Sequence, residues 1–523
     1  MGISSSAVLS LLYYSLLLSS TSWPTSSSTS SVHEDFVQCI HLHKPPNSVP
    51  IYTPTNSSYS SLLQASARNL RFLSPTFLKP QLIVTPLHES HVQATVVCSH
   101  KHGLDVKVRS GGHDVEGLSF VSEAPFIIVD LINFRSIHVD VENGTAWVQA
   151  GANLGEVYYK IGEKSKTLGF PAGFCPTVGV GGHLSGGGFG ALVRKYGLAA
   201  DQVIDARIVN VNGEILDKET MGEDLFWAIR GGGASSFGVV LSWKIKLVPI
   251  PATVTVATIG KTLEQGAIDL VHRWQFIADR LHEDLYLGLT LTKVNATAQA
   301  VFSVLFLGGI ENLLPLMKES FPELGLKRED CMEMSWVESH VYFYARGRPL
   351  EYLLNRNDPM SKVFMKAKSD HVKEPIPKDG LKGLWRRLVQ EDMPVLLLTP
   401  FGGRMNEISE SENPFPHRVG NIYNICYMTN WFQQIESEKH IGWTRRLYKY
   451  MTPYVSKCPR TAYINYKDLD LGQYKNGKVS YSKGRVWGRK YFKSNFERLV
   501  EVKSKVDPGN FFKNKQSIPP INA

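Results

Sequence analysis

Two stretches of this sequence decide its fold: Arg109–Asp114, RSGGHD, and Gly173–Gly190, GFCPTVGVGGHLSGGGFG. The first follows an alternating, β-like run, as expected where a strand ends. Small residues at such a place expose successive backbone N–H groups, which form a nest for an anion such as a pyrophosphate. Each stretch also carries a nucleophilic side chain, His113 or Cys175. We therefore expect a phosphate-bearing ligand beside two nucleophiles.

Both motifs resemble those of the berberine bridge enzyme-like family, plant FAD-linked oxidases of the vanillyl-alcohol-oxidase (PCMH-type) fold that include cannabinoid-acid synthases and reticuline oxidase. The resemblance extends over nearly the whole chain after its first segment. It implies a bicovalently held FAD, bonded through its 8α-methyl group to His113 and through C6 to Cys175. The rest of both motifs is then expected to bind FAD: Arg109, Ser110, Gly111, Gly112, Asp114, Gly179, Gly181, Gly182, His183, Ser185, Gly186, Gly187 and Gly188.

A third segment, Tyr463–Gly472, is similar to the family's YxNYRDLDLG motif. By this resemblance Tyr466 is the catalytic base. A phenol titrates near pH 10, so this role requires a neighbouring cation that lowers its pKa. Lys467 is adjacent, but in a strand it would point to the opposite face, which leaves the cation unidentified. The alternative is that Tyr466 only packs against a sheet.

Val178 occupies the place in the family motif that lies near the flavin and controls access of oxygen. The resemblance associates valine there with oxidases and leucine with dehydrogenases. Val178 therefore implies reoxidation of the flavin by O2, with release of hydrogen peroxide. Alternatively, Val178 is only a packing residue.

The expected substrate wall departs from the family pattern. Cys426 and Asn424 stand on a strand where relatives carry Gln or Glu, and Phe401 stands where cannabinoid-acid synthases have Tyr. Neither Cys426 nor Asn424 suits a general base at neutral pH. This makes ring closure of an amine by a carboxylate doubtful and favours phenol or prenyl-phenol chemistry.

These features predict an FAD-dependent oxidase of a plant specialised metabolite: a phenol, a prenyl-phenol or an alkaloid. A hydride would pass to flavin N5, O2 would regenerate the flavin, and the product can cyclise. Two alternatives stay open. One is a redox-neutral cyclase or Diels–Alderase that uses the flavin as a scaffold. The other is a carbohydrate or monolignol oxidase, which the missing Gln counts against.

Composition and spacing argue against several other partners. The 523 residues carry a formal charge of +9, spread without a basic block, so nucleic-acid binding is not expected. The glycine runs contain no GxGxxG in a strand–turn–helix setting, which argues against a nicotinamide site. The 16 histidines show no metal-ligand spacing. We expect a monomer whose partners are a small molecule and O2.

The N-terminus predicts secretion to the apoplast, or to a vacuole or vesicle. Ala7–Leu18 is an apolar core too short to span a bilayer, and a Ser/Thr-rich stretch follows, so residues 1–25 are interpreted as a signal peptide. A myristoylation pattern at Gly2 is the weaker alternative. Sequons predict glycosylation at Asn56, Asn143 and Asn295. The family resemblance implies one disulfide, Cys39–Cys98.

The chain is predicted to be α+β, with a PCMH-type FAD-binding domain and an antiparallel-sheet substrate domain carrying helices on one face. The expected parts are residues 26–74 and 75–250 of the FAD domain, 251–470 of the substrate domain, and a C-terminal return over 471–523. Strands are predicted at 126–131, 145–150, 285–291, 300–307 and 394–398, and helices at 153–161 and 262–281.

Overall fold

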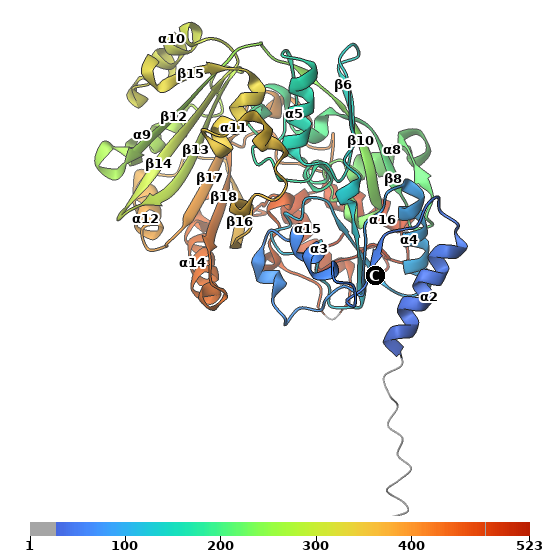
Figure 1. Cartoon of the computed structure of the whole chain (residues 1–523). Helices are drawn as coiled ribbons and strands as arrows, with labels where there is room; N and C mark the ends of the chain where they lie inside the picture. The colour runs from blue at the N-terminus through green and yellow to red at the C-terminus, as the bar shows by residue number, and fades with distance from the viewer. Residues whose placement is uncertain (1–27, 476) are drawn as a thin grey trace, which may run out of the picture.

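The computed structural model describes residues 28–475 and 477–523. The predicted signal peptide lies outside these residues. The described chain has two parts (Figure 1). The motif half comprises residues 28–253 and 462–523 and contains both glycine-rich motifs. The sheet half comprises residues 254–461 and is built on one large sheet.

The motif half is built on two main sheets, and a short two-stranded sheet pairs β7 (Leu168–Gly169) with β11 (Val248–Pro249). The smaller of the two main sheets has the strand order β1-β2-β4-β3, in which β4 pairs in parallel with both β2 and β3. The larger is antiparallel, with the order β5-β6-β10-β8-β9. The strands are β1 (Ile51–Tyr52), β2 (Leu82–Val84), β3 (Asp105–Arg109), β4 (Phe126–Asp130), β5 (Ile137–Asp140), β6 (Thr145–Gln149), β8 (Val203–Val209), β9 (Ile215–Leu216) and β10 (Val239–Lys246).

Both glycine-rich motifs follow regular elements of the motif half. The first begins in β3 and continues into the loop after it. The second begins after β7 (Leu168–Gly169) and includes the short helix α6 (Val180–Ser185). Helix α5 (Leu154–Lys164) lies between the motifs in sequence, and the Glu156 carboxylate accepts a hydrogen bond from the Asn153 N–H at its start.

The sheet half is a seven-stranded antiparallel sheet with the order β15-β12-β14-β13-β17-β18-β16. Helices cover its outer face (Figure 1), where they share an apolar core with the strands. The elements are β12 (Val254–Thr262), β13 (Leu285–Val294), β14 (Thr297–Phe306), β15 (Cys331–Met334), β16 (Phe364–Val372), β17 (Pro394–Pro400), β18 (Tyr423–Trp431), α9 (Ala267–Trp274), α10 (Ile310–Ser320), α12 (Lys378–Leu388) and α14 (Ser437–Tyr450).

Side-chain alternation gives this sheet two different faces. On β13, Leu285 and Leu287 belong to the core under the helices, whereas Tyr286 and Gly288 face the motif half. On β18, Ile425 lies in that core and Cys426 faces the motif half. The second face is therefore available as the wall of a site.

The C-terminal segment returns to the motif half. Helices α15 (Tyr481–Phe492) and α16 (Asn495–Val506) pack into the same core as the larger sheet of that half (Figure 1). Trp487, Phe496 and Leu499 are buried there. The motif half is thus formed from two separate parts of the chain.

The predicted strands and the helix at 153–161 are present with small shifts at their ends. The helix expected over 262–281 is wrong. Strand β12 continues to Thr262, and the helix α9 is limited to Ala267–Trp274. Gly266, at φ +80°, separates α9 from the preceding turn, because the left-handed backbone conformation interrupts a helix.

Cys39 and Cys98 form the disulfide that the resemblance implied. The three sequon residues, Asn56, Asn143 and Asn295, are exposed. Within the described residues, no helix is both long enough and apolar enough to cross a bilayer.

Candidate functional site

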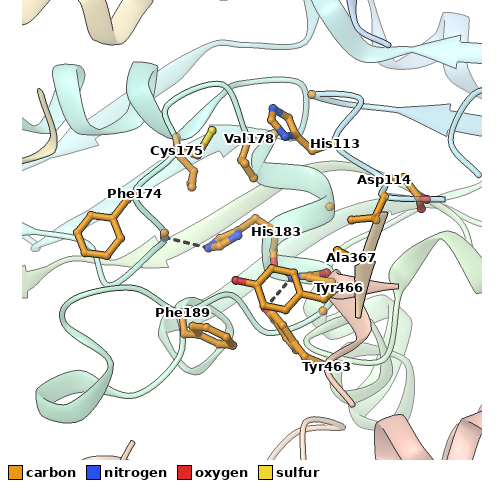
Figure 2. A pocket seen from close by; sticks show the side chains of 18 of the residues that line it. His113, Asp114, Phe174, Cys175, Val178, His183, Phe189, Ala367, Tyr463 and Tyr466 are labelled. Atoms are coloured by element: carbon orange, nitrogen blue, oxygen red, sulfur yellow. Dashed lines mark hydrogen bonds between the residues drawn. The ribbon is translucent and has the colours of Figure 1, made fainter. Parts of the chain in front are cut away.

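A cavity of about 680 Å³ lies between the two glycine-rich motifs and the inner face of the large sheet (Figure 2). Its motif wall includes many small residues and the two predicted nucleophiles, His113 and Cys175. Its opposite wall comes from alternate residues of the sheet. The described lining includes most of the residues predicted to bind FAD: Ser110, Gly111, Gly112, Asp114, Gly179, Gly181, Gly182, His183, Ser185 and Gly186.

The two motif loops contact each other backbone to backbone. A Cβ atom on Gly111 would lie 2.3 Å from the Gly179 nitrogen, and one on Gly179 would lie 2.2 Å from the Gly111 nitrogen. Any larger residue at either position would force the loops apart. This contact explains how His113 and Cys175, from motifs far apart in sequence, line the same wall (Figure 2).

The Thr177 hydroxyl lies between the two nucleophiles. Its Oγ1 is 2.9 Å from His113 Nε2 and 3.4 Å from Cys175 Sγ. Thr177 is fully buried, whereas His113 and Cys175 are partly exposed to the cavity. One side chain therefore holds both nucleophiles in place.

Both histidines of the motifs are neutral at pH 7. Burial, together with the nearby Arg68 guanidinium, lowers the pKa of His113 to about 3. Burial lowers the pKa of His183 to about 4, and its Nε2 accepts a hydrogen bond from the Gly173 N–H at 3.2 Å. A neutral imidazole keeps the lone pair that a nucleophile requires.

Three residues of the motifs do not line the cavity, contrary to expectation. The Arg109 guanidinium is fully buried behind the loop, where it pairs with Asp130 and donates to the Leu63 carbonyl at 2.7 Å. Gly187 and Gly188 also lie behind the cavity surface, and the Gly188 N–H donates to the Tyr463 hydroxyl at 2.8 Å. These residues shape the loops rather than contact a ligand in the cavity.

Tyr466 lines the cavity, but in a short 3₁₀ helix, Ile464–Tyr466, and not in a strand as expected. Asn465 attaches this helix to the second motif, because its Nδ2 donates to the His183 carbonyl at 2.9 Å. Burial raises the pKa of Tyr466 well above its usual value, and the neighbouring Cys426 and Tyr463 raise it further. The expected lowering of this pKa does not occur, so the phenol is protonated at neutral pH.

Of the three predicted wall residues, Cys426 lines the cavity, and burial raises the pKa of its thiol to about 12. Asn424 and Phe401 do not line it. Asn424 lies farther along β18, where its Nδ2 donates to the Asp370 carbonyl at 3.1 Å. Phe401 is fully buried behind Phe189, with ring centroids 5.5 Å apart.

The sequence motifs did not reveal an aromatic part of the cavity. Phe343 and Tyr344 come from helix α11 (Trp336–Ala345), and Tyr286 comes from β13. Phe174 packs against Phe343, with ring centroids 5.4 Å apart. The successive aromatic residues of α11 were a usable signal, but their direction depends on how the helix docks.

The described cavity lining contains one carboxylate, Asp114. Its Oδ1 accepts hydrogen bonds from the backbone N–H groups of Glu116 at 2.9 Å and Leu118 at 3.1 Å. These bonds stabilise the turn after His113. The lining thus provides neutral imidazole, thiol and phenol groups, and one oxygen of its carboxylate is engaged by the backbone.

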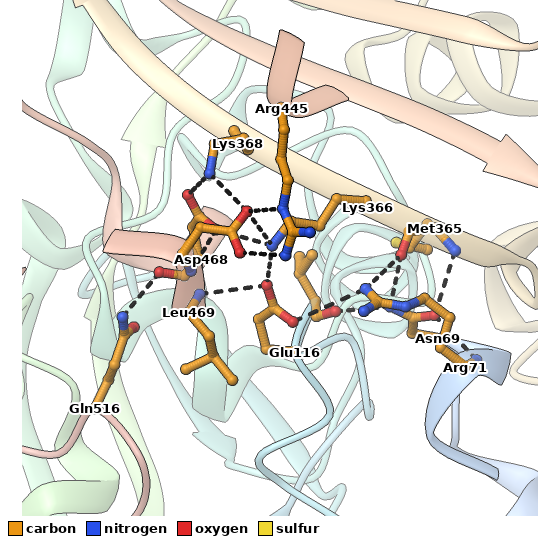
Figure 3. A network of polar contacts seen from close by, with 12 residues as sticks. Asn69, Arg71, Glu116, Met365, Lys366, Lys368, Arg445, Asp468, Leu469 and Gln516 are labelled. Carbon is orange, nitrogen blue, oxygen red and sulfur yellow. Dashed lines mark hydrogen bonds and ion pairs between the residues drawn. The ribbon is translucent and has the colours of Figure 1, made fainter. Parts of the chain in front are cut away.

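A buried ion-pair network holds the sheet wall against both the His113 loop and the Tyr466 segment (Figure 3). Lys366 Nζ pairs with Glu116, which follows His113 by three residues. It also pairs with Asp468, which follows Tyr466 by two residues, at 2.8 Å. Lys368 also pairs with Asp468. Ala367, between the two lysines on β16, lines the cavity.

Comparisons with known proteins cover both glycine-rich motifs and the Tyr466 segment. The model of the FAD binding domain matches residues 80–218, which include both nucleophiles, and the model described as "Berberine and berberine like" matches residues 462–519, which include Tyr466. The chain is 65% identical to a tetrahydroberberine oxidase from Argemone mexicana, over 99% of this chain and 97% of that protein.

Two further comparisons extend the match. A tetrahydroberberine oxidase from Berberis wilsoniae is 54% identical, over 99% of this chain and 100% of that protein. The crystal structure of berberine bridge enzyme from Eschscholzia californica is 40% identical, with a TM-score of 0.90, and covers 94% of this chain and 100% of that one. These matches confirm the resemblance and the fold class that the motifs predicted.

The ion-pair network yields a stability prediction. Substituting Lys366→Met removes the buried ammonium from Glu116 and Asp468, so Glu116 keeps only the long contact with Arg71 at 3.9 Å, and breaking such a buried pair typically costs about 3–5 kcal/mol. We expect the free energy of unfolding in urea to fall by this amount. In the control, Lys160→Met removes the exposed pair with Glu163 and should leave stability unchanged. Equal stability of the two variants would contradict the importance of the network.

Proposed function

The chain belongs to the berberine bridge enzyme-like family of FAD-dependent oxidoreductases, and we propose that it oxidises a cyclic tertiary amine of the tetrahydroberberine type. The proposal includes bicovalent attachment of FAD to His113 and Cys175. Two relatives that match nearly the whole chain are named tetrahydroberberine oxidases. The neutral imidazole of His113 and the thiol of Cys175, both at the cavity surface, are the groups that such attachment requires.

One observation carries the choice of substrate class: the described lining has a single carboxylate, Asp114, whose Oδ1 accepts two backbone hydrogen bonds, and its Tyr466 phenol and Cys426 thiol are kept protonated by burial. When a hydride leaves the carbon next to an amine nitrogen, the nitrogen lone pair forms the C=N bond of an iminium cation. No proton has to leave in this step. A cavity whose Tyr466 and Cys426 stay protonated therefore suits a tertiary amine.

The aromatic wall suits the positive charge that develops in this step. FAD, when bound, supplies N5 as the hydride acceptor. The developing iminium is stabilised by the faces of aromatic rings, and this effect is stronger in a site from which water is excluded. Tyr286, Phe343 and Tyr466 offer such rings at the cavity surface.

The raised pKa of Tyr466 counts against the phenol chemistry that the sequence favoured. Oxidation of a phenol, an alcohol or a sugar requires removal of a proton, and the pKa of Tyr466 is raised instead of lowered. We propose that Tyr466 contacts the substrate through its ring and its protonated hydroxyl.

Substitution of Tyr466 by Phe tests this role. Loss of a general base lowers turnover by about 10²–10⁴-fold, whereas loss of a contact that keeps the ring has a smaller effect. We expect Tyr466→Phe to reduce kcat less than about tenfold with tetrahydroberberine and to leave the pH profile unchanged. A larger loss, together with a pH profile that changes, would identify Tyr466 as the base.

Anaerobic mixing with candidate substrates tests the proposed function. We expect tetrahydroberberine to bleach the flavin absorbance and air to restore it with formation of hydrogen peroxide. Glucose, coniferyl alcohol and a prenylated phenol serve as comparisons and should leave the absorbance unchanged. Bleaching by one of these and not by the amine would overturn the proposal. A product formed without bleaching would instead indicate a redox-neutral cyclase.

Val178 provides a separate test of oxygen reactivity. It lines the cavity one residue from Thr177, which contacts both nucleophiles. We propose that its small side chain leaves room for O2 beside the flavin. Val178→Leu should slow reoxidation by air, measured by stopped flow, while anaerobic bleaching keeps its rate. Unchanged reoxidation in this variant would show that Val178 is only a packing residue.

A further inference from the structure

The attachment residues share one buried hydroxyl, which nothing in the sequence motifs assigned to chemistry. We infer that Thr177 is a positioning residue for the covalent attachment of FAD, in that its hydroxyl accepts a hydrogen bond from His113 and donates one to Cys175. This inference rests on the bicovalent attachment proposed above. Its geometric basis is the pair of contacts at 2.9 Å to His113 Nε2 and 3.4 Å to Cys175 Sγ.

The direction of the two hydrogen bonds follows from the chemistry of imidazole. Since Nε2 of His113 is engaged by Thr177, Nδ1 is the nitrogen left to act as the nucleophile. Nδ1 has a free lone pair only in the tautomer that carries its hydrogen on Nε2. Nε2–H then donates to Thr177 Oγ1, and the single hydroxyl hydrogen is left to point at Cys175 Sγ.

Charges around the pair support the same arrangement. Arg68 is buried, and its Nε donates to the Gly111 carbonyl beside His113 at 3.3 Å. Burial and this positive charge lower the pKa of His113, which keeps its imidazole neutral. The Tyr344 hydroxyl, which also lines the cavity, donates to the Asp358 carboxylate at 2.6 Å.

Each attachment is an oxidation that balances with O2. At Cys175, the new S–C bond replaces the S–H bond and the C–H bond at flavin C6. At His113, the new N–C bond replaces one N–H bond and one C–H bond of the 8α-methyl group. The imidazole proton is lost from Nε2, whose hydrogen bond Thr177 Oγ1 accepts until then, and it leaves with the methyl-group proton and the two electrons in hydrogen peroxide. Each attachment leaves two electrons on the flavin, which pass to O2 and yield hydrogen peroxide.

The test compares the rate and the extent of attachment in Thr177 variants. Purified proteins are incubated with excess FAD in air, and peptide masses then report the FAD bound to His113 and to Cys175. Loss of the hydroxyl in Thr177→Val removes a hydrogen bond to each nucleophile, so both attachments should slow about 10- to 100-fold. Thr177→Ser keeps the hydroxyl and should attach FAD at the wild-type rate.

Controls separate this role from a structural one. Thr95→Val removes another buried hydroxyl hydrogen bond of the motif half, that to the His91 carbonyl, and should leave attachment unchanged. Non-covalent FAD binding and circular dichroism establish that each variant is folded. If Thr177→Val does not fold, Thr177→Ala replaces it, because it removes the hydroxyl without filling the space.

The possible outcomes separate the role of Thr177 from the proposed bicovalent attachment of FAD. Wild-type protein without covalent FAD on both residues would overturn the proposed attachment itself. Wild-type protein with both bonds, together with wild-type rates in a folded Thr177→Val or Thr177→Ala variant, would overturn the role of Thr177 alone. Slow attachment in Thr177→Ser as well would assign the effect to packing and contradict the hydrogen-bond argument.

Discussion

The site depends on one constraint, the backbone contact between Gly111 and Gly179. With no side chain at either position, the two motif loops approach to a distance that any Cβ atom would prevent. This contact places His113 and Cys175 on one wall of the cavity, with the Thr177 hydroxyl between them. The nucleophiles are thus positioned by backbone packing.

The second half of the site follows from the pleat of the large sheet. Alternate residues of β13 and β18 fill the core beneath the outer helices, and the residues between them face the cavity. Lys366 and Lys368 on β16 then bind the acidic residues that flank the His113 loop and the Tyr466 segment (Figure 3). Buried ion pairs therefore fix the sheet wall relative to the His113 loop and the Tyr466 segment.

The sequence motifs grouped residues that do line one cavity, because the residues of each motif are close together in the chain. The nucleophiles stand in glycine-rich motifs, and the periodic patterns identified most strands because period-two alternation reflects the pleat itself. The helix expected over 262–281 failed, because the pattern did not reveal that β12 continues to Thr262 or that Gly266 limits α9.

The remaining wrong predictions concern the direction in which a side chain points and how deeply it is buried, and both depend on tertiary structure. Arg109 belongs to a motif that lines the cavity, yet its guanidinium points behind the loop to Asp130. Phe401 lies just after a wall strand but packs behind Phe189. The pKa of Tyr466 rises because the fold buries the phenol beside Cys426 and provides no cation among the groups that shift it. No adjacent residue in the sequence carries that information.

The most direct test of this account is the intact mass of denatured wild-type and Gly179→Ala protein. The wild-type mass should exceed that of the polypeptide by one FAD, less the hydrogen atoms displaced by two new bonds. In Gly179→Ala the added Cβ separates the loops, so FAD should remain on one residue or be lost on denaturation. Two intact bonds in Gly179→Ala would contradict the claim that this contact positions the nucleophiles.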